Sequence, residues 1–318
     1  MTTNKRILGK SDLHVSPIAF GGNVFGWTLD KQQSFRMLDA FTDAGFNFID
    51  TADTYSTWVP GNQGGESETI IGQWLKEHGK RDELIIATKL GGEMGAGRKG
   101  LSASYIHEAV EASLKRLGTD YIDLYQSHYD DPETPVDETI EAFNVLIKSG
   151  KVRYIGASNL PADRITESNR FAAANGFEGY ASLQPLYNLY DRQLFEAEYL
   201  SLVQAEGLGV ITYYALASGF LSGKYRNEGD LGQSPRGGGV KKYLDARGLR
   251  ILDALDQVAG ESMASPAQVA LAWQLSKPYV TAPIASATSE QQLDDLIAAA
   301  NLDLTTEQVV LLDKASAY

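Results

Sequence analysis

Residues 121–159 read YIDLYQSHYDDPETPVDETIEAFNVLIKSGKVRYIGASN, and this stretch contains one complete unit of strand, helix and strand. An apolar run at Tyr121–Gln126 is followed by a loop and then by apolar residues at helical spacing, namely Ile140, Phe143 and Ile147. Thr134 is expected to cap this helix, with Pro135 in its first turn and Gly150 at its end. A second run follows at Val152–Ala157, so the two strands should pair in parallel through a right-handed crossover.

Apolar runs of the same kind recur along the chain, each followed by a helical pattern. They are Ile18–Phe20, Phe46–Asp50, Leu84–Lys89, Tyr121–Gln126, Val152–Ala157, Tyr180–Gln184, Val210–Thr212 and Tyr279–Ile284. No linker-like tract divides the sequence, so residues 1–318 are predicted to form one domain. Eight units of this type predict an α/β fold, a single (β/α)8 TIM barrel.

Three segments lie outside the eight units. Arg6–Val15 has a turn sequence between two short apolar edges, which predicts an N-terminal β-hairpin that plugs one end of the barrel. A Gly-rich insertion at Arg226–Gly239 and an additional helix are expected between the seventh and eighth strands, although the sequence assigns the 226–246 region no role. Thr305–Leu312 predicts an extra C-terminal helix.

The composition excludes several classes of protein. The 318 residues include 28 Lys and Arg against 41 Asp and Glu, and a net charge of −13 is opposite to the basic footprint of a nucleic-acid-binding protein. There is no Cys and there are only four His, so neither a thiolate site nor a multi-histidine metal centre is expected. Neither a signal peptide nor a run of about 18 apolar residues is recognisable, so we expect a cytoplasmic protein without a membrane partner. Nothing in the sequence indicates an oligomeric state.

Four polar residues follow the ends of neighbouring predicted strands. Asp50 closes the second strand and Tyr55 follows it, Lys89 closes the third strand, and His128 follows the fourth. One such residue alone is usually a loop or surface residue. Because barrel active sites lie at the carboxyl ends of the strands, however, we expect these four side chains to converge.

Together these side chains are suited to proton donation. Free tyrosine, with a pKa near ~10, is too weak an acid at neutral pH, but an adjacent Lys cation favours the phenolate and is expected to lower this pKa. Asp50 would hold Lys89 charged, and a neutral His128 would orient the same substrate oxygen that Tyr55 protonates. This chemistry fits carbonyl reduction, for which the hydride must come from a cofactor.

The sequence resembles the aldo-keto reductase family in an ordered series of segments from Arg6 to at least Leu296. They are Leu8–Ser16, Phe48–Tyr55, Gly65–Glu68, Thr88–Lys89, Gln126–His128, Gly150–Asn159, Gln184 with Tyr187 and Asn188, and Gly219–Tyr225. The resemblance implies a reductase of aldehydes and ketones linked to NADP(H) or NAD(H), which also oxidises the alcohol in reverse. It implies a catalytic tetrad of Asp50, Tyr55, Lys89 and His128, with Tyr55 as the general acid.

The resemblance also implies a set of cofactor-binding residues. Asp50 is shared with the tetrad, Ser158, Asn159 and Gln184 resemble the carboxamide clamp, and Tyr213 resembles the ring that stacks on nicotinamide. The pyrophosphate strap would run through Leu216, Ser218, Gly219 and Leu221, with Lys224 as a charge partner. The family commonly has Ser-Pro where this chain has Tyr214 and Ala215.

The adenosine end is implied to lie at Ser286, Thr288, Gln292 and Asp295. NADP(H) is favoured by the family resemblance, but NAD(H) stays open because residues 283–295 contain no Lys or Arg to hold a 2′-phosphate. We hypothesise that Arg236, Lys241 or Lys242 of the Gly-rich insertion supplies this charge. The alternative is that the insertion is a solvated loop.

Aromatic residues cluster in the loops after the strands and predict a substrate pocket. Phe25, Trp27, Trp58 and Tyr129 are expected to line it, which suggests a large apolar or sugar-stacking site. Aldehydes, ketones, keto-sugars and polyketide-like ketones all fit this pattern.

Three alternatives stay open. Gly95–Gly100 matches G-x-G-x-x-G after a predicted strand, but the expected helix begins only after the third Gly, so we interpret the segment as a flexible loop rather than a Rossmann motif. Lys89 could form a Schiff base in an aldolase. A nucleotide-binding barrel with little turnover could act as a regulatory protein, as channel-associated relatives are thought to do.

Overall fold

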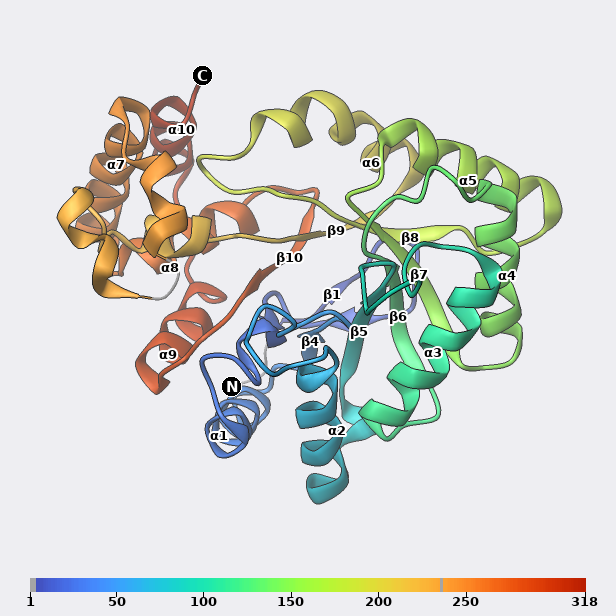
Figure 1. Ribbon diagram of the computed structural model, residues 1–318. Helices are drawn as coiled ribbons and strands as arrows, with labels where there is room; N and C mark the ends of the chain where they lie inside the picture. Colours follow the sequence, from blue (N-terminus) through green and yellow to red (C-terminus); the bar gives the residue numbers. More distant parts are fainter. Residues whose placement is uncertain (1–3, 235–236) are drawn as a thin grey trace.

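The computed structural model describes residues 4–234 and 237–318, and its centre is a closed barrel of parallel strands (Figure 1). The barrel strands are β3 (Ala19–Gly21), β4 (Phe48–Asp50), β5 (Ile85–Leu90), β6 (Ile122–Ser127), β7 (Val152–Ser158), β8 (Tyr180–Gln184), β9 (Gly209–Thr212) and β10 (Val280–Ala285). They pair in the order β10-β3-β4-β5-β6-β7-β8-β9, and β10 closes the barrel against β3. The predicted (β/α)8 barrel is confirmed.

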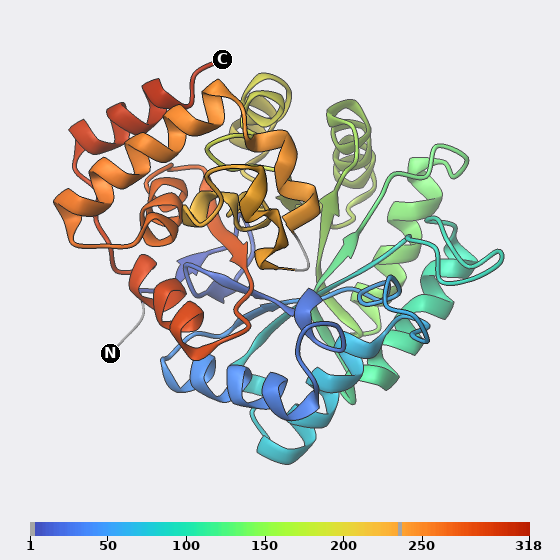
Figure 2. The same ribbon diagram turned by 60° about the vertical axis from the view of Figure 1, so that its left-hand side comes forward.

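Helices surround the strands on the outside of the barrel, as Figure 2 shows. They are α1 (Lys31–Asp43), α2 (Glu66–His78), α3 (Ala103–Leu117), α4 (Val136–Lys148), α5 (Ala162–Asn175), α6 (Leu200–Glu206), α7 (Ala246–Ser262), α8 (Pro266–Leu275), α9 (Glu290–Ala299) and α10 (Thr306–Ala315). The additional helix before β10 is α7, and the expected C-terminal helix is α10. The insertion before α7 forms short 3₁₀ segments at Glu228–Gln233 and Gly237–Tyr243.

The cap expected for α4 was wrong by one residue. Pro135 occupies the N-cap position, and the Thr134 hydroxyl donates to the Asp131 carboxylate at 2.7 Å instead of capping the helix. Asp131 also accepts from the backbone N–H of Leu101. Because its carboxylate binds the Thr134 hydroxyl within the loop ahead of the helix, this hydroxyl is not available to cap α4. Gly150 lies just beyond the end of α4 with a φ of 75°, a conformation that favours glycine.

The N-terminal hairpin closes the end of the barrel at which the strands begin. Strands β1 (Arg6–Ile7) and β2 (His14–Val15) pair antiparallel, as predicted. Leu8, Leu13 and Val15 are buried in one cluster with residues that point into the barrel, namely Ala19, Phe48, Ala87, Leu124, Ile211 and Ala282. Apolar contact of this kind excludes water from this end of the barrel. A ligand site is therefore expected at the opposite end, where the strands finish.

The Gly95–Gly100 segment is a loop between β5 and α3. The Arg98 N–H donates to the Gly95 carbonyl at 3.0 Å, and α3 begins only at Ala103, with Ser102 as its N-cap. The Rossmann alternative therefore fails, because the barrel contains no open doubly wound sheet and the helix starts too late to present its N-terminus to this loop.

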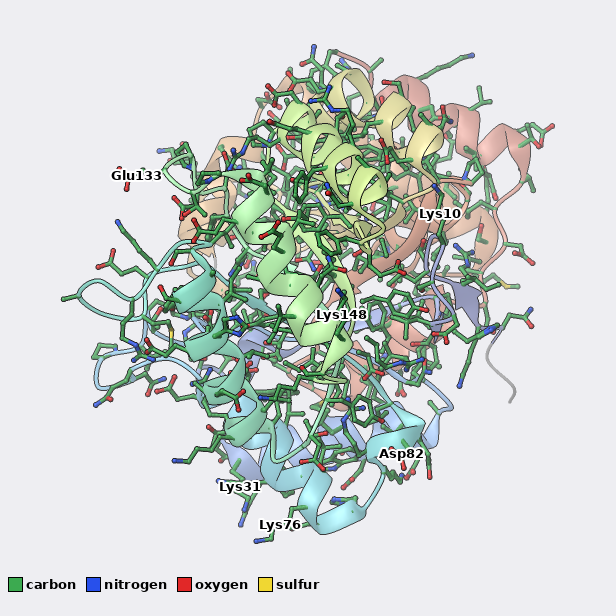
Figure 3. The ribbon with its side chains drawn as sticks, turned by 90° about the vertical axis from the view of Figure 1, so that its right-hand side faces the viewer. Lys10, Lys31, Lys76, Asp82, Glu133 and Lys148 are labelled. Atoms are coloured by element: carbon green, nitrogen blue, oxygen red, sulfur yellow. The ribbon has the colours of Figure 1, made fainter. Side chains whose placement is uncertain are left out.

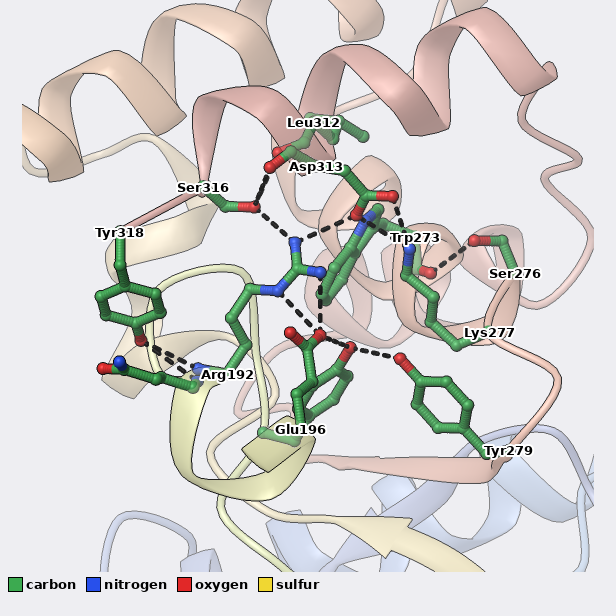
Figure 4. Close-up of polar contacts among 12 residues, drawn as sticks. Arg192, Glu196, Trp273, Ser276, Lys277, Tyr279, Leu312, Asp313, Ser316 and Tyr318 are labelled. Atoms are coloured by element: carbon green, nitrogen blue, oxygen red, sulfur yellow. Dashed lines mark hydrogen bonds and ion pairs between the residues drawn. The ribbon is translucent and has the colours of Figure 1, made fainter. Parts of the chain in front are cut away.

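The C-terminal helix is fastened to the loop after β8, as Figure 4 shows in close-up. The Arg192 guanidinium donates to Asp313 at 3.0 Å and to the Ser316 hydroxyl at 2.8 Å, and it also pairs with Glu196. The hydroxyl of Tyr318 donates to the Tyr190 carbonyl at 2.6 Å. These contacts fix the 188–193 loop, which in turn contacts the backbone of the loop after β9.

Charged side chains lie mainly on the outer surface of the helices and loops. In Figure 3 the labelled residues are all exposed, namely Lys10, Lys31, Lys76, Asp82, Glu133 and Lys148. Within the described residues, no helix has the length and apolar character needed to cross a bilayer.

Candidate active site

Strands β4, β5 and β6 are neighbours in the barrel (Figure 1). The polar residues at their ends accordingly converge. The Lys89 ammonium donates to the Asp50 carboxylate at 2.6 Å and to the Tyr55 hydroxyl at 2.8 Å. The Tyr55 and His128 rings lie edge to face with centroids 6.2 Å apart. Lys89 and Asp50 are fully buried, so a charged pair lies directly beneath a phenol and an imidazole.

Asp50 is the most heavily coordinated member of this group. Besides Lys89, it accepts a hydrogen bond from the Gln184 amide at 2.8 Å and from the Gln126 amide at 3.3 Å. The Tyr55 hydroxyl reaches the same carboxylate only at 3.4 Å, so its hydrogen is weakly held. Gln126 lies in a segment that resembles the family but was not predicted to belong to the site, although a polar residue near the end of a buried strand is a signal that could have identified it.

The electrostatics differ in one respect from the sequence expectation. Burial, reinforced by Asp50, raises the pKa of Tyr55 well above its ordinary value, whereas Lys89 was expected to lower it. Burial of the phenol is the larger cause, and the neighbouring Asp50 carboxylate adds to it. Burial lowers the pKa of Lys89, and this is opposed by the attraction of Asp50.

His128 is neutral at physiological pH, as expected. Burial, aided by the Lys89 charge, lowers its pKa well below 6.5. Its Nδ1 atom has no hydrogen-bond partner in the described part of the chain, and its ring stacks on Tyr129 with centroids 4.5 Å apart. A neutral imidazole with this environment is suited to hydrogen bonding with an uncharged ligand oxygen.

A cavity of about 1140 Å³ opens above Tyr55 and His128. Most of the residues assigned to the cofactor and substrate line it, namely Ser158, Asn159, Gln184, Tyr213, Leu216, Ser218, Gly219, Lys224, Ser286, Thr288, Gln292, Asp295, Trp27, Trp58 and Tyr129. Asp50 lies beneath its floor, and Leu221 is fully buried away from it. The cavity exceeds the usual ~300–1,000 Å³ of a small-molecule pocket, so its size suits a long ligand together with a smaller one.

The expectation that Phe25 lines the pocket was wrong. Its side chain is fully buried and stacks on Phe20 with centroids 5.4 Å apart. Phe25 follows the short 3₁₀ turn Gly22–Val24, which directs its ring into the packing between α1 and the barrel instead of the cavity. The ring of an aromatic residue that follows a strand can point either into the cavity or into the apolar core, and the ring of Phe25 points into the core.

The clamp residues after β7 and β8 are bonded to one another. The Ser158 hydroxyl donates to the Gln184 carbonyl at 2.9 Å, and the Asn159 amide donates to the Ser158 hydroxyl at 3.1 Å. The Tyr213 hydroxyl donates to the Asn159 side-chain oxygen at 2.8 Å. Asn159 has a φ of 55°, a conformation that Asn tolerates better than most residues. The amides and the Tyr213 ring are thus held in fixed orientations around the cavity.

The backbone after β9 adopts a costly conformation. Tyr214, Ala217 and Ser218 have φ values of 53°, 49° and 58°, and each such non-glycine residue costs of order 1–3 kcal/mol. Two amides hold the path: Asn188 donates to the Tyr214 carbonyl at 3.0 Å, and Gln274 donates to the Ala215 carbonyl at 2.9 Å. Strain of this kind, secured by side chains from elsewhere, is characteristic of a ligand-binding segment.

At the far end of the cavity, the 283–295 segment is also well ordered. The Ser286 hydroxyl donates to the Gly21 carbonyl at 2.8 Å, and the Thr288 N–H donates to the Gln292 side chain. Asp295 accepts from Gln268 at 2.7 Å and from the Ser265 hydroxyl at 3.2 Å. These interactions join β3, β10, α8 and α9 around this end.

The cations proposed for the insertion do not all reach the cavity. Lys241 pairs with Glu228, and Lys242 lies 4.6 Å from the centre of the Tyr243 ring; neither lines the cavity. Arg236 lies outside the described residues. Lys224 is the cation that lines the cavity within the described part of the chain.

Asp53 is a buried carboxyl group that was given no role from the sequence. It is 2% exposed, and neither of its carboxylate oxygens accepts a hydrogen bond from a side chain of the described residues. Nearby, Glu68 accepts from Arg116 and from the Thr88 hydroxyl, both at 2.6 Å. Burial, reinforced by Glu68, raises the pKa of Asp53 to about 8. Beside two paired carboxylates, Asp50 and Glu68, Asp53 is therefore a carboxylic acid that stays protonated near neutral pH.

Comparison with known proteins agrees with this geometry. Residues 17–317 match the model of the Aldo/keto reductase family. The chain is 38% identical to a probable voltage-gated potassium channel subunit beta from Oryza sativa subsp. japonica, over 95% of this chain and 93% of that protein. It is 35% identical to an uncharacterized oxidoreductase from Bacillus subtilis (strain 168), over 96% and 94%. It is 32% identical to an aryl-alcohol dehydrogenase from Pestalotiopsis microspora, over 98% and 84%. With a barrel of this topology and a family match over nearly its whole length, the chain belongs to the aldo/keto reductase family.

Proposed function

We propose that this protein reduces aldehydes or ketones with NAD(P)H, with Tyr55 as the proton donor, and oxidises the corresponding alcohols in reverse. The observation that carries the proposal is the contact of Lys89 with both Tyr55 and Asp50 at the floor of the cavity. A weakly held phenol hydrogen above a buried ammonium group is an arrangement suited to protonating an oxygen that gains negative charge.

The chain's own residues account for the proton transfer. As the carbonyl oxygen gains negative charge, the Tyr55 hydroxyl releases its hydrogen to it, and the 2.8 Å contact from Lys89 stabilises the phenolate that results. Asp50 keeps Lys89 in place from below at 2.6 Å. A neutral His128 donates a hydrogen bond that orients the same oxygen. The raised pKa of Tyr55 keeps the phenol protonated until this moment.

The residues around the cavity fit a nicotinamide dinucleotide, which when bound supplies the hydride that no side chain can provide. The side-chain oxygens of Asn159 and Gln184 can accept from a carboxamide, because the N–H groups of both side chains already donate within the protein. The Tyr213 ring, fixed by Asn159, offers a flat surface. The strained segment through Ser218 and Gly219 suits a pyrophosphate, with Lys224 to balance charge. The strained backbone conformation after β9 supports the proposal most strongly, because strain of this kind is typical of segments that bind a ligand.

An aldolase using Lys89 is disfavoured. The ammonium group is fully buried and donates to Asp50, to the Thr51 carbonyl and to the Tyr55 hydroxyl, at 2.6, 2.8 and 2.8 Å. These three hydrogen bonds use all three N–H groups, so no lone pair is presented to the cavity for attack on a carbonyl.

The test of the proposed function follows oxidation of NADPH and of NADH with a panel of carbonyl compounds. Turnover with either nucleotide is the expected result. One observation favours a second candidate, because the rice relative is named as a potassium channel subunit. Tight nucleotide binding without turnover of any carbonyl compound would contradict the reductase and favour that regulatory role instead.

The pH dependence of reduction gives a separate prediction. Because the pKa of Tyr55 is raised above 10.0 and that of His128 is lowered below 6.5, the acid is protonated and the imidazole neutral throughout this range. Between pH 6.5 and pH 10.0, the kcat for reduction is therefore expected not to change through ionisation of Tyr55 or His128. It should fall only above pH 10.0, as Tyr55 loses its proton. The profile is measured under saturating conditions in wild type and in Asp53→Asn, since Asp53 titrates within the range. A change of kcat near neutral pH that occurs in both proteins and disappears in His128→Gln would contradict this prediction.

Cofactor choice can be tested by binding. Arg236→Ala is expected to weaken NADPH binding by about tenfold or more and to leave NADH binding nearly unchanged, because only NADPH carries the 2′-phosphate that an Arg can pair with. Titration of the protein's tryptophan fluorescence gives both dissociation constants. Lys241→Ala is the matched control, because Lys241 pairs with Glu228. Equal loss of both nucleotides, or no loss, would refute a role of Arg236 in phosphate recognition.

A further inference from the structure

The 188–193 loop connects the backbone after β9 to the C-terminal residues. Its first residue, Asn188, is fully buried and donates to the Tyr214 carbonyl at 3.0 Å. The side-chain oxygen of Asn188 in turn accepts from the backbone N–H groups of Tyr190 and Asp191, both at 2.8 Å. The conformation of the loop therefore sets the direction of the amide that holds Tyr214.

Two side chains fasten this loop to the end of α10, as Figure 4 shows. The Tyr318 hydroxyl donates to the Tyr190 carbonyl at 2.6 Å and accepts from the backbone N–H of Arg192 at 3.2 Å. The guanidinium of Arg192, which is mostly buried, donates to Asp313 and to the Ser316 hydroxyl. Arg192 and Tyr318, the loop anchors, thus join the end of α10 to the loop that positions the Asn188 amide.

The strained backbone after β9 depends on support from outside its own segment. Tyr214 has a φ of 53°, and a non-glycine residue keeps such a conformation only where its surroundings hold it. Because Asn188 supplies part of this support, loosening of the 188–193 loop should lower the fraction of molecules in which Tyr213 and Ser218 are correctly placed along the cavity. A smaller competent fraction raises the apparent dissociation constant of a ligand by the same factor.

We propose that Arg192 and Tyr318 are positioning residues for nucleotide binding, which act through Asn188 on the backbone at Tyr214. This inference rests on the proposed function, because it takes the nucleotide to lie against the segment after β9. Within the part of the chain that the structure describes, neither anchor lines the cavity, so their effect must pass through the 188–193 loop. Tyr318 is 64% exposed, and nucleotide affinity is thereby set in part from the protein surface.

Arg192→Gln removes the first anchor without leaving its carboxylate partners unpaired. Asp313 still accepts from Lys277 at 2.8 Å, and Glu196 still accepts from the Tyr187 hydroxyl at 2.9 Å. The substitution therefore releases the loop from α10 and creates no uncompensated buried charge.

Tyr318→Phe removes the second anchor and keeps its aromatic ring. The guanidinium of Arg247 lies 3.7 Å from the centre of this ring, a contact that phenylalanine can also make. The variant with both substitutions is therefore expected to fold, and thermal unfolding checks that it is folded at the temperature of the binding assay.

The variant with both substitutions is expected to bind NADPH and NADH about fivefold more weakly than wild type, a size typical of changes that act through a network of contacts. Both nucleotides should be affected equally, because the segment after β9 is proposed to contact the pyrophosphate that they share. Titration of tryptophan fluorescence gives the dissociation constants. The kcat at saturating nucleotide should stay within about twofold of wild type, since neither anchor contacts the reacting groups.

A double-mutant cycle tests the path through Asn188. In an Asn188→Ala background, the two anchor substitutions should cause no further loss of nucleotide affinity, because the amide through which they act is absent. Arg153→Gln is the matched control. Arg153 lies near the beginning of β7, at the opposite end of the barrel, and donates to Asp123 at 2.7 Å and to Asp12 at 2.8 Å. Its replacement should leave both dissociation constants unchanged.

The outcomes separate this inference from the proposed function. If wild type binds neither NADPH nor NADH, the cofactor proposal fails and this inference fails with it. If wild type binds them and the variant without both anchors binds them equally well, only the role of the anchors is overturned. A loss that is fully additive with that of Asn188→Ala overturns the proposed path, and an equal loss in Arg153→Gln would show a general effect of destabilisation instead of positioning.

Discussion

Tyr55→Phe is expected to lower kcat for carbonyl reduction by about 10³-fold, within the range of about 10²–10⁴ that a positioned general acid contributes. The substitution removes the hydroxyl that accepts from Lys89 at 2.8 Å and reaches Asp50 at 3.4 Å, and it leaves the ring in place. Nothing else that contacts the carbonyl oxygen can replace the lost proton, because His128 has a pKa lowered by burial and is neutral. Nucleotide affinity should hardly change, since the residues proposed to hold the nucleotide lie at the ends of β7 and β8 and in the segment after β9.

The measurement compares kcat and nucleotide dissociation constants in wild type and the variant. Tyr121→Phe is the control, because it removes a hydroxyl that donates to Asp82 on the outside of the protein and should leave kcat unchanged. Activity within about tenfold of wild type in Tyr55→Phe would show that another group, or water, donates the proton. A parallel loss of nucleotide binding would instead indicate that the variant has disturbed the site as a whole.

Asp53→Asn is expected to stabilise the protein at pH 8 but not at pH 4. The pKa of Asp53 is raised from 3.8 to about 8 by burial and by Glu68. For a group with a raised folded-state pKa, the stabilising contribution is fully present below the unfolded value and is lost as the pH rises through the folded value. Relative to the variant, wild type should therefore lose about 1.4 kcal/mol of unfolding free energy per pH unit from about pH 4 to about pH 8.

The charges around Asp53 explain why its ionisation is unfavourable. Glu68 from α2 and Arg116 from α3 already form a pair at 2.6 Å, and Lys89 from β5 is paired with Asp50. A further carboxylate would thus be an uncompensated buried charge, and it would also be repelled by Glu68. Urea unfolding at several pH values measures the difference between wild type and Asp53→Asn.

The control for this experiment is an exposed carboxylate. Asp253→Asn on α7 makes the same change of residue type at an exposed position, so it reports the general effect of replacing an Asp by Asn. A pH-independent difference in Asp53→Asn would contradict the assignment of a protonated acid. The slope of free energy against pH is the deciding quantity, because a change of packing alone would shift the whole curve equally.

The barrel and the convergence of polar residues at one of its ends were predictable because both follow from local and periodic features. The apolar runs recur at regular spacing, and parallel strands bring their carboxyl ends to one edge, so Asp50, Lys89 and His128 had to approach each other once β4, β5 and β6 were neighbours. The same argument could have included Gln126, which lies on β6 and donates to Asp50.

Other features depended on which groups meet in three dimensions. Phe25 was expected in the cavity but packs on Phe20, because the direction of a ring after a strand depends on the turn and on the core beside it. The rise in the pKa of Tyr55 depends on its depth of burial and on Asp50, and neither can be measured along the sequence. The same holds for Asp53, whose raised pKa depends on residues from other elements.

The sequence by itself determined the fold, the order of the strands and which residue types stand at their ends, because hydrophobic periodicity and right-handed crossovers leave few alternatives. Only the tertiary structure decided the protonation of those residues and the course of the backbone after β9. Both depend on contacts between distant segments, such as Asn188 with Tyr214 and Asp50 with Lys89. These contacts lie in the protein interior, where a low dielectric constant strengthens charge interactions and hydrogen bonds.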